Sequence, residues 1–200
     1  GINIAKGEIL LFTDIDCRLQ DNWVQITANL FDSNIDYMIG YAHAPNHINF
    51  VSLYQKIDYM MLMFAANGAI SGGRYWSSSG QNQAYRKSVF EKVGGFNDIK
   101  NYLQGDDSLF LQICNNKINN FKAIFNSDLR SSIVCRQEIH TLSFLKQRIR
   151  WSADAKSMWK FNIGFFIMAV STLSSNISVI LLLLLFYLNK ITLLMLVIPI

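Results

Sequence analysis

The stretch Gly7-Glu8-Ile9-Leu10-Leu11-Phe12-Thr13-Asp14-Ile15-Asp16 places two aspartates directly after a short apolar run. The consecutive apolar residues Ile9–Phe12 predict a strand buried on both faces, as in parallel sheets. Because residues i and i+2 of a strand share a face, Asp14 and Asp16 are expected to point together from the carboxyl edge of the sheet, where open α/β sheets bind ligands. Two neighbouring carboxylates repel each other unless a cation lies between them, and Mg²⁺ and Mn²⁺ prefer oxygen ligands. The stretch predicts a divalent-metal site; a strand running into a polar turn is the alternative.

The composition is apolar for a soluble protein, since 51% of the 200 residues are hydrophobic and 16% are charged. The cause is local, because residues 161–188 contain no Lys, Arg, Asp or Glu. This run exceeds the ~20 residues that cross a bilayer, so we predict a transmembrane helix at about residues 163–188. A second apolar run predicts another such helix that starts at residue 191 and is cut off by the chain end. The chain also lacks an initiating Met, and we expect a fragment that is truncated at both ends.

The distribution of charge is more informative than the net charge of +4. Residues 146–160 contain one acid, Asp154, and several basic residues: Lys146, Arg148, Arg150, Lys156 and Lys160. Basic residues beside a membrane segment mark its cytoplasmic side. The adjoining apolar run makes a membrane the expected partner of this cluster, rather than nucleic acid. The three cysteines have no metal-type spacing and predict reduced thiols in a cytosolic domain.

Hydrophobic periodicity and turn residues predict alternating strands and helices up to the membrane segment. Expected strands lie at residues 37–42, 121–125 and 132–134; expected helices lie at residues 23–31 and 50–66, before Gly94-Gly95, after Asp106-Asp107, and from Thr141. The helix at residues 50–66 is interpreted as either core or a membrane-surface element. Residues 68–80, rich in glycine and serine, predict a mobile loop. This order indicates an α/β fold.

Four motifs in this order resemble those of membrane-bound family 2 glycosyltransferases with a GT-A fold, such as cellulose- and hyaluronan-synthase-like enzymes. They are Asp14-Ile15-Asp16, the segment 80–86 with Gly94-Gly95-Phe96, Gly105-Asp106-Asp107, and Gln147-x-x-Arg150-Trp151 before a transmembrane helix. The resemblance implies a partial GT-A (Rossmann-like) catalytic domain at residues 1–160, with its N-terminal nucleotide-binding part missing, and a transmembrane region at residues 161–200.

The resemblance also implies an activity and a place in the cell. Such an enzyme is an inverting, metal-dependent hexosyltransferase that takes a sugar from a nucleotide-sugar, here expected to be a UDP-sugar. The acceptor would be a saccharide or a lipid-linked molecule at the cytoplasmic face of the cell membrane. The protein would be multi-pass, with a cytoplasmic catalytic domain, membrane lipid as a partner and no nucleic acid.

By family position, Asp16 is expected to bind Mg²⁺ or Mn²⁺, while Asp14 holds the nucleotide-sugar or supports the metal. An acceptor hydroxyl is a poor nucleophile and needs a carboxylate to take its proton. The resemblance assigns this role to Asp107, with Asp106 in place of the usual acid before it. That departure leaves the assignment within the pair open, and capping of the following helix is the structural alternative.

The remaining motif residues are expected to bind donor or acceptor. Arg150, with Gln147 in the same motif, would offer a planar guanidinium to the diphosphate. Trp151 would offer an aromatic face to the acceptor sugar, or else would anchor the chain at the membrane interface. Asn82 and Arg86 are expected to line the donor or acceptor pocket.

Two other functions compete with this interpretation. A haloacid-dehalogenase-type phosphatase also places DxD after an apolar strand, but its pattern requires Thr or Val where this chain has Arg18. It also gives no reason for the Gln147-to-Trp151 motif. A non-catalytic membrane scaffold is the second alternative, and the intact carboxylates in both acidic motifs argue against it.

Overall fold

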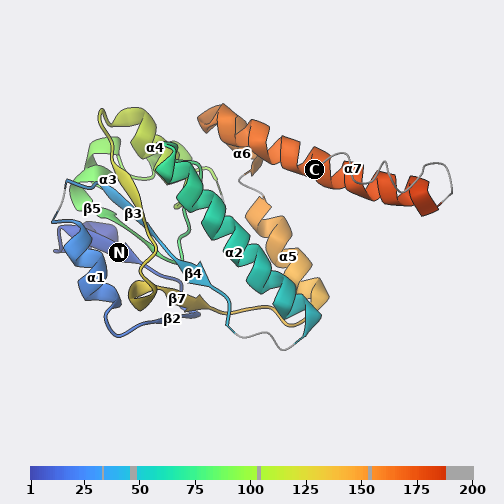
Figure 1. Cartoon of the computed structure of the whole chain (residues 1–200). Coiled ribbons are helices and arrows are strands. Elements are labelled where there is room, and N and C mark those ends of the chain that lie inside the picture. The colour runs from blue at the N-terminus through green and yellow to red at the C-terminus, as the bar shows by residue number, and fades with distance from the viewer. Residues whose placement is uncertain (33, 46–48, 103–104, 153–154, 188–200) are drawn as a thin grey trace. The chain divides into compact units, whose positions relative to one another are not determined.

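The computed structural model describes residues 1–200 except residues 33, 46–48, 103–104, 153–154 and 188–200 (Figure 1). The chain divides into two compact units, residues 1–154 and residues 155–200. The first unit is mixed α/β, as predicted. Besides the elements named below, it contains three short 3-10 turns: η1 (Ile2–Ile4), η2 (Asn97–Ile99) and η3 (Leu129–Ser131).

The larger sheet of the first unit is mixed rather than parallel. Its order is β1 (Ile9–Phe12), β5 (Gln83–Arg86), β3 (Tyr37–Gly40) and β6 (Ala123–Asn126). Strand β5 runs antiparallel to both of its neighbours, while β3 and β6 are parallel.

The predicted strand Ile9–Phe12 is confirmed, but its expected environment is wrong. Among the described strands β1 pairs with β5 alone, and only Leu10 in it is fully buried. Because β1 has a described neighbouring strand on one side only, the side chains of Ile9, Leu11 and Phe12 stay partly exposed.

A smaller sheet adjoins this one, in the order β2 (Cys17–Leu19), β7 (Ile133–Cys135) and β4 (Ala42–His43). The strand predicted at residues 37–42 is divided at Tyr41 between the two sheets. The Tyr41 N–H donates to the Asn126 carbonyl at 3.0 Å, and the Tyr41 carbonyl accepts from the Ile133 N–H at 3.1 Å. Residues 13–16 make the second crossing, from β1 to β2, so both aspartates lie where the chain changes sheet.

Aromatic side chains pack between the larger sheet and helices α3 (Lys87–Val93) and α4 (Ser108–Lys117). Tyr85 stacks on Phe12 and lies against Phe110, with ring centroids 4.7 and 4.9 Å apart. Gly94 ends α3 in the left-handed conformation, at φ 82°. A Cβ on Gly95 would come within 2.8 Å of the Phe90 ring. The Gly94-Gly95-Phe96 motif therefore has a packing function.

The described part of the first unit contains three further helices: α1 (Trp23–Leu30), α2 (Phe50–Ser71) and α5 (Thr141–Trp151). Helix α2 is longer than the predicted 50–66. It begins with a capping box, in which Asn49 and Ser52 bond reciprocally. Figure 1 shows α5 beside α2, and the Tyr54 and Phe144 rings meet edge to face at 5.6 Å. The predicted helix from Thr141 is confirmed.

The second unit contains α6 (Ala155–Phe161) and α7 (Ile163–Tyr187). Helix α7 has 25 residues and a mean hydropathy of 2.1, so it is long and apolar enough to cross a membrane by length and composition alone. The helix predicted to start at residue 191 lies outside the described residues.

Asn82 ties several elements of the first unit together. Its side chain is fully buried. The Oδ1 atom accepts from the Trp23 indole N–H at 3.0 Å, and Nδ2 donates to the carbonyls of Tyr41 (3.0 Å) and Ser131 (3.2 Å). A Cβ on Gly40 would collide with the amide of Asn82. Glycine at position 40 is therefore required by this junction.

We predict that Gly40→Ala lowers the free energy of unfolding by about 1–3 kcal/mol, because the added methyl overpacks the Asn82 amide. Gly68→Ala is the matched control, since Gly68 lies inside α2 with open space around its Cα. That change should raise the free energy of unfolding by about 0.5–1 kcal/mol through helix propensity. Urea unfolding in detergent measures both. Equal effects of the two substitutions would contradict the packing described for Asn82.

Candidate active site

Asp14 and Asp16 lie in the turn between β1 and β2. The Cys17 N–H donates to the Asp14 carbonyl at 3.1 Å and closes the turn. Both aspartates are exposed, and one carboxylate oxygen of each lies within 4.8 Å of the other and of the Cys17 Sγ. Cys17 Sγ also donates to Cys135 Sγ at 3.3 Å. The two carboxylates are therefore close together, as predicted, although a turn rather than strand alternation brings them there.

Three other charges act on Asp14, one from the neighbouring Asp16 and two from distant parts of the sequence. Partial desolvation raises the pKa of Asp14, and the negative charges of Asp16 and Asp106 raise it further, while Arg150 acts in the opposite direction. Like charges nearby disfavour the ionised carboxylate. Asp106 before α4 and Arg150 at the end of α5 are therefore both within electrostatic range of the turn at 14–16.

Asp106 and Asp107 occupy different environments. The Asp106 side chain is exposed, and its backbone carbonyl accepts from Gln83 Nε2 at 3.2 Å. Asp107 is half-buried and caps α4: one carboxylate oxygen accepts from the Ser108 N–H and the other from the Gly80 N–H, the latter at 3.2 Å. Capping is thus part of the role of Asp107, while the exposed Asp106 contributes to the electrostatics of Asp14.

The glycine- and serine-rich segment is bound to α4, not the mobile loop that we predicted. Residues 68–71 belong to α2. Farther on, the Ser78 N–H donates to Ser108 Oγ at 3.1 Å, and Ser108 Oγ donates to the Ser78 carbonyl at 3.0 Å. Composition predicted an irregular backbone correctly for residues 72–80 only, and it could not show which partners satisfy the polar groups there.

The Gln147-to-Trp151 motif lies on α5. Arg150 is exposed, and its charge acts on Asp14. The Gln147 Oε1 atom is buried and has no hydrogen-bond partner among the described residues. Trp151 meets Tyr59 edge to face at 5.8 Å, and the Arg148 guanidinium lies 4.3 Å from the centroid of its ring. The Trp151 ring therefore already packs against α2. A contact between this ring and an acceptor sugar stays a prediction.

Arg148 was not singled out by the sequence reasoning. It forms an ion pair with Asp58 of α2, at 2.5 Å. Burial raises the pKa of Asp58 and lowers the pKa of Arg148, while the charge of each partner opposes these shifts. Breaking a buried pair on one side leaves an uncompensated charge. The pair therefore fixes α5, with its motif, on α2. Asp58 is the only acid in the apolar α2 sequence, and this isolated charge was the feature of the sequence that could have indicated a buried ion pair.

Arg86 lies away from the carboxylates. In the β1–β5 pairing Arg86 is opposite Ile9, at the start of β1, whereas Asp14 follows its end. The Arg86 guanidinium donates to the carbonyls of Ile35, at 2.8 Å, and Phe31, at 2.5 Å. The structure therefore does not bring Arg86 to the aspartates, and it places Asn82 in the core.

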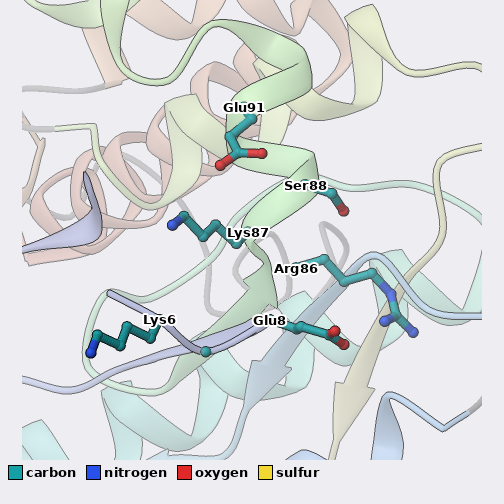
Figure 2. A pocket seen from close by; sticks show the side chains of 7 residues that line it. Lys6, Glu8, Arg86, Lys87, Ser88 and Glu91 are labelled. Carbon is teal, nitrogen blue, oxygen red and sulfur yellow. The ribbon is translucent and has the colours of Figure 1, made fainter. Parts of the chain in front are cut away.

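A pocket of about 330 Å³ lies beside Arg86 (Figure 2). Its lining residues are Lys6, Gly7, Glu8, Arg86, Lys87, Ser88 and Glu91. Charges of both signs line it, and the Lys87 ammonium donates to the Ala5 carbonyl at 2.8 Å. Asp14, Asp16 and Asp106 are not among the lining residues, so the pocket is separate from the carboxylate cluster.

Residues 1–199 match the family model described as Glycosyl transferase family 21. No curated protein matches the chain significantly.

We predict that Asp14→Asn raises the melting temperature at neutral pH in the absence of divalent metal, because it removes one of the clustered like charges. The raised pKa of Asp14 means that the folded state binds more protons than the unfolded state just above the ordinary value of 3.8, so its contribution to stability falls as pH rises through this window. In the Asp14→Asn variant this decrease in stability with rising pH should be absent. Mn²⁺ should raise the melting temperature of the wild type and have little effect on the variant.

Asp32→Asn is the matched control, because Asp32 is an exposed aspartate outside the carboxylate cluster. It should respond to Mn²⁺ as the wild type does. An equal Mn²⁺ response in the Asp14 variant would show that the cation binds elsewhere.

Proposed function

Because the chain belongs to glycosyltransferase family 21, we propose that it transfers a sugar, with inversion, from a nucleotide-sugar donor to a saccharide or lipid-linked acceptor. A UDP-sugar is the expected donor. The observation that carries the proposal is the convergence of Asp14, Asp16 and Asp106 with Arg150. A diphosphate donor has the negative charge that a cation and a guanidinium bind. Family membership favours this reaction over phosphatase chemistry, for which Arg18 breaks the pattern.

Asp16 and Asp14 would hold Mg²⁺ or Mn²⁺. The residues fit such an ion, since two exposed carboxylates lie together and their mutual repulsion is relieved by a cation. When bound, the cation would stabilise the charge of the diphosphate leaving group. Cys17 is a soft ligand that is already hydrogen-bonded to Cys135, so the two carboxylates are the proposed donor set.

The diphosphate is proposed to bind Arg150, whose guanidinium offers paired donors to phosphate oxygens. Gln147 is proposed to bind a polar group of the donor or acceptor. Its buried Oε1 has no partner among the described residues and can accept a hydrogen bond from a ligand hydroxyl. Both residues lie on α5, and the Arg148–Asp58 pair fixes this helix.

Asp107 is proposed as the general base. The acceptor oxygen attacks the anomeric carbon, its proton passes to a carboxylate oxygen, and the bond to the diphosphate breaks on the opposite side of the sugar. The hydrogen bonds from Ser108 and Gly80 hold the Asp107 carboxylate in one orientation, as a positioned base requires. Asp106 is the alternative base, because its exposed carboxylate lies in the electrostatic range of Asp14.

Membrane attachment is the further part of the proposal. Helix α7 follows the basic residues at 146–160 and is apolar over 25 residues. We place the catalytic unit on the cytoplasmic side by the positive-inside rule. A second transmembrane helix beginning at residue 191 would make the protein multi-pass. This arrangement favours an acceptor that is presented at the membrane.

The test is sugar transfer and donor hydrolysis by the membrane-reconstituted protein, across a panel of UDP-sugars with Mn²⁺. Asp107→Asn should lower transfer ~10²- to 10⁴-fold and spare donor binding, because a base acts on the acceptor. Asparagine also caps helices well, so α4 should stay folded. Asp106→Asn should have the smaller effect.

The reverse ranking would move the base to Asp106. Mn²⁺-dependent nucleotide binding without transfer or hydrolysis of any donor would contradict the proposed reaction and favour the binding scaffold.

A further inference from the structure

Gln83 is a polar side chain in the core of the first unit. It lies on β5, and its exposed fraction is 1%. A buried primary amide needs hydrogen-bond partners for its oxygen and its nitrogen, because burying an unpaired polar group is costly. A methionine side chain would fill a similar space without that requirement. The partners of the Gln83 amide therefore indicate what a glutamine does at this position.

The amide oxygen of Gln83 accepts from two hydroxyl groups. The Tyr37 hydroxyl donates to Gln83 Oε1, and the Ser78 hydroxyl donates to the same atom at 3.0 Å. Tyr37 is fully buried on β3, which pairs with β5, whereas Ser78 belongs to the glycine- and serine-rich segment. Two donors from different segments therefore hold the amide in one orientation.

The amide nitrogen of Gln83 binds the backbone of the acidic pair. Its Nε2 atom donates to the Asp106 carbonyl at 3.2 Å. A carbonyl can only accept, so the opposite orientation of the amide would set two oxygens against each other. This carbonyl belongs to the peptide unit that joins Asp106 to Asp107. Gln83 therefore holds, from the core side, the peptide that leads into the proposed base.

The same network reaches the Asp107 carboxylate from the other side. Ser78, which binds the Gln83 amide, also binds Ser108 through its own backbone N–H at 3.1 Å. The N–H groups of Ser108 and Gly80 donate to the two Asp107 oxygens. Helix α4 begins only at Ser108, and the Asp107 backbone, at φ −114° and ψ −84°, is neither helical nor extended. The regular helix therefore does not set the position of Asp107, and these contacts do.

We propose that Gln83 is a positioning residue for the general base: its amide holds the Asp106–Asp107 peptide so that the Asp107 carboxylate faces the acceptor hydroxyl. This inference rests on the proposed function, in which Asp107 takes the acceptor proton. Gln83 itself is too buried to contact a substrate. Its loss should therefore slow the chemical step and leave donor binding unchanged.

The first test is Gln83→Met in the membrane-reconstituted protein, which removes the three hydrogen bonds and keeps an uncharged side chain of similar size. We expect kcat for transfer, measured with the UDP-sugar panel, to fall ~10- to 10²-fold, because misplacing a reacting group by about 1 Å can cost this much. Calorimetry should show unchanged Mn²⁺-dependent UDP binding.

Gln55→Met is the matched control, because Gln55 is also fully buried and its amide binds backbone groups. Gln55 Nε2 donates to the Glu138 carbonyl at 2.6 Å, and Oε1 accepts from the Glu138 N–H at 3.0 Å. These bonds do not involve the acidic pair. The control variant should lose stability, as Gln83→Met does, but should keep the wild-type kcat.

Gln83→Glu separates positioning from packing through its pH dependence. A buried carboxyl has a raised pKa. While protonated, it keeps a donor for the Asp106 carbonyl and an acceptor for the two hydroxyls, and on ionising it loses the donor. The ratio of variant to wild-type kcat should therefore rise as pH falls, whereas the ratio for Gln83→Met should stay low at every pH. Comparison with the wild type at each pH accounts for the titration of the acidic pair itself.

Hydrogen exchange gives a readout that does not depend on activity. Peptides containing Gly80 and Ser108 should exchange faster in Gln83→Met and not in Gln55→Met, because their N–H groups lose a fixed partner in Asp107. If the wild type transfers no donor, the proposed function fails, and the exchange result alone decides whether Gln83 holds the acidic pair.

Unchanged exchange at both sites, or a loss of UDP binding as large as the loss of kcat, would overturn the proposal. Circular dichroism checks that each variant folds. If Gln83→Met does not fold, Gln83→Glu decides the matter, since a wild-type kcat at every pH would show that the amide is not needed to position the base.

Discussion

The fold has to tolerate the repulsion of the Asp14 carboxylate by the negative charges of Asp16 and Asp106. Like charges near a partly desolvated carboxylate are costly, and among the described residues the charge of Arg150 opposes them at Asp14. The acids come from two segments about ninety residues apart, and the arginine comes from a third. A chain that keeps this arrangement without a bound cation must hold each segment by contacts that lie elsewhere. A cation bound between these carboxylates would relieve the repulsion. In a glycosyltransferase it would also stabilise the negative charge of the donor diphosphate.

Three sets of contacts hold the segments in place. Asn82 links α1 to Tyr41, where the chain crosses from β3 to β4 between the two sheets. Ser108 binds the backbone of Ser78 in both directions and holds the glycine-rich segment on the start of α4. The Arg148–Asp58 pair holds α5 on α2. Each contact joins residues remote in sequence, and none of them involves the clustered carboxylates.

Local patterns predicted much of the fold. The Ile9–Phe12 strand, the helix stop at Gly94-Gly95 and the helix from Thr141 follow from apolar runs, turn residues and helical spacing, all of which lie within a few residues of the element. The proximity of Asp14 and Asp16 was predictable for the same reason. The motif resemblance assigned Arg150 to the diphosphate, but its effect on Asp14 was not predicted, since no local pattern connects it to the aspartates.

The remaining features depend on pairings across the sequence. Arg86 and Asn82 are near neighbours in one motif, yet the antiparallel pairing of β5 with β1 takes Arg86 to the far end and leaves Asn82 in the core. Periodicity gave α2 an apolar character but could not assign a partner to each face. Arg148 looked like one more basic residue near a membrane helix, because its acid lies ninety positions upstream.

The central claim is that the strand-end carboxylates bind a cation beside a diphosphate held by Arg150. The most direct test is a crystal of the protein with Mn²⁺ and UDP, in which anomalous scattering locates the manganese. The account predicts a manganese peak between the carboxylates of Asp14 and Asp16, with the diphosphate oxygens directed toward the Arg150 guanidinium. Bound UDP with manganese elsewhere, or with no manganese at those carboxylates, would contradict it.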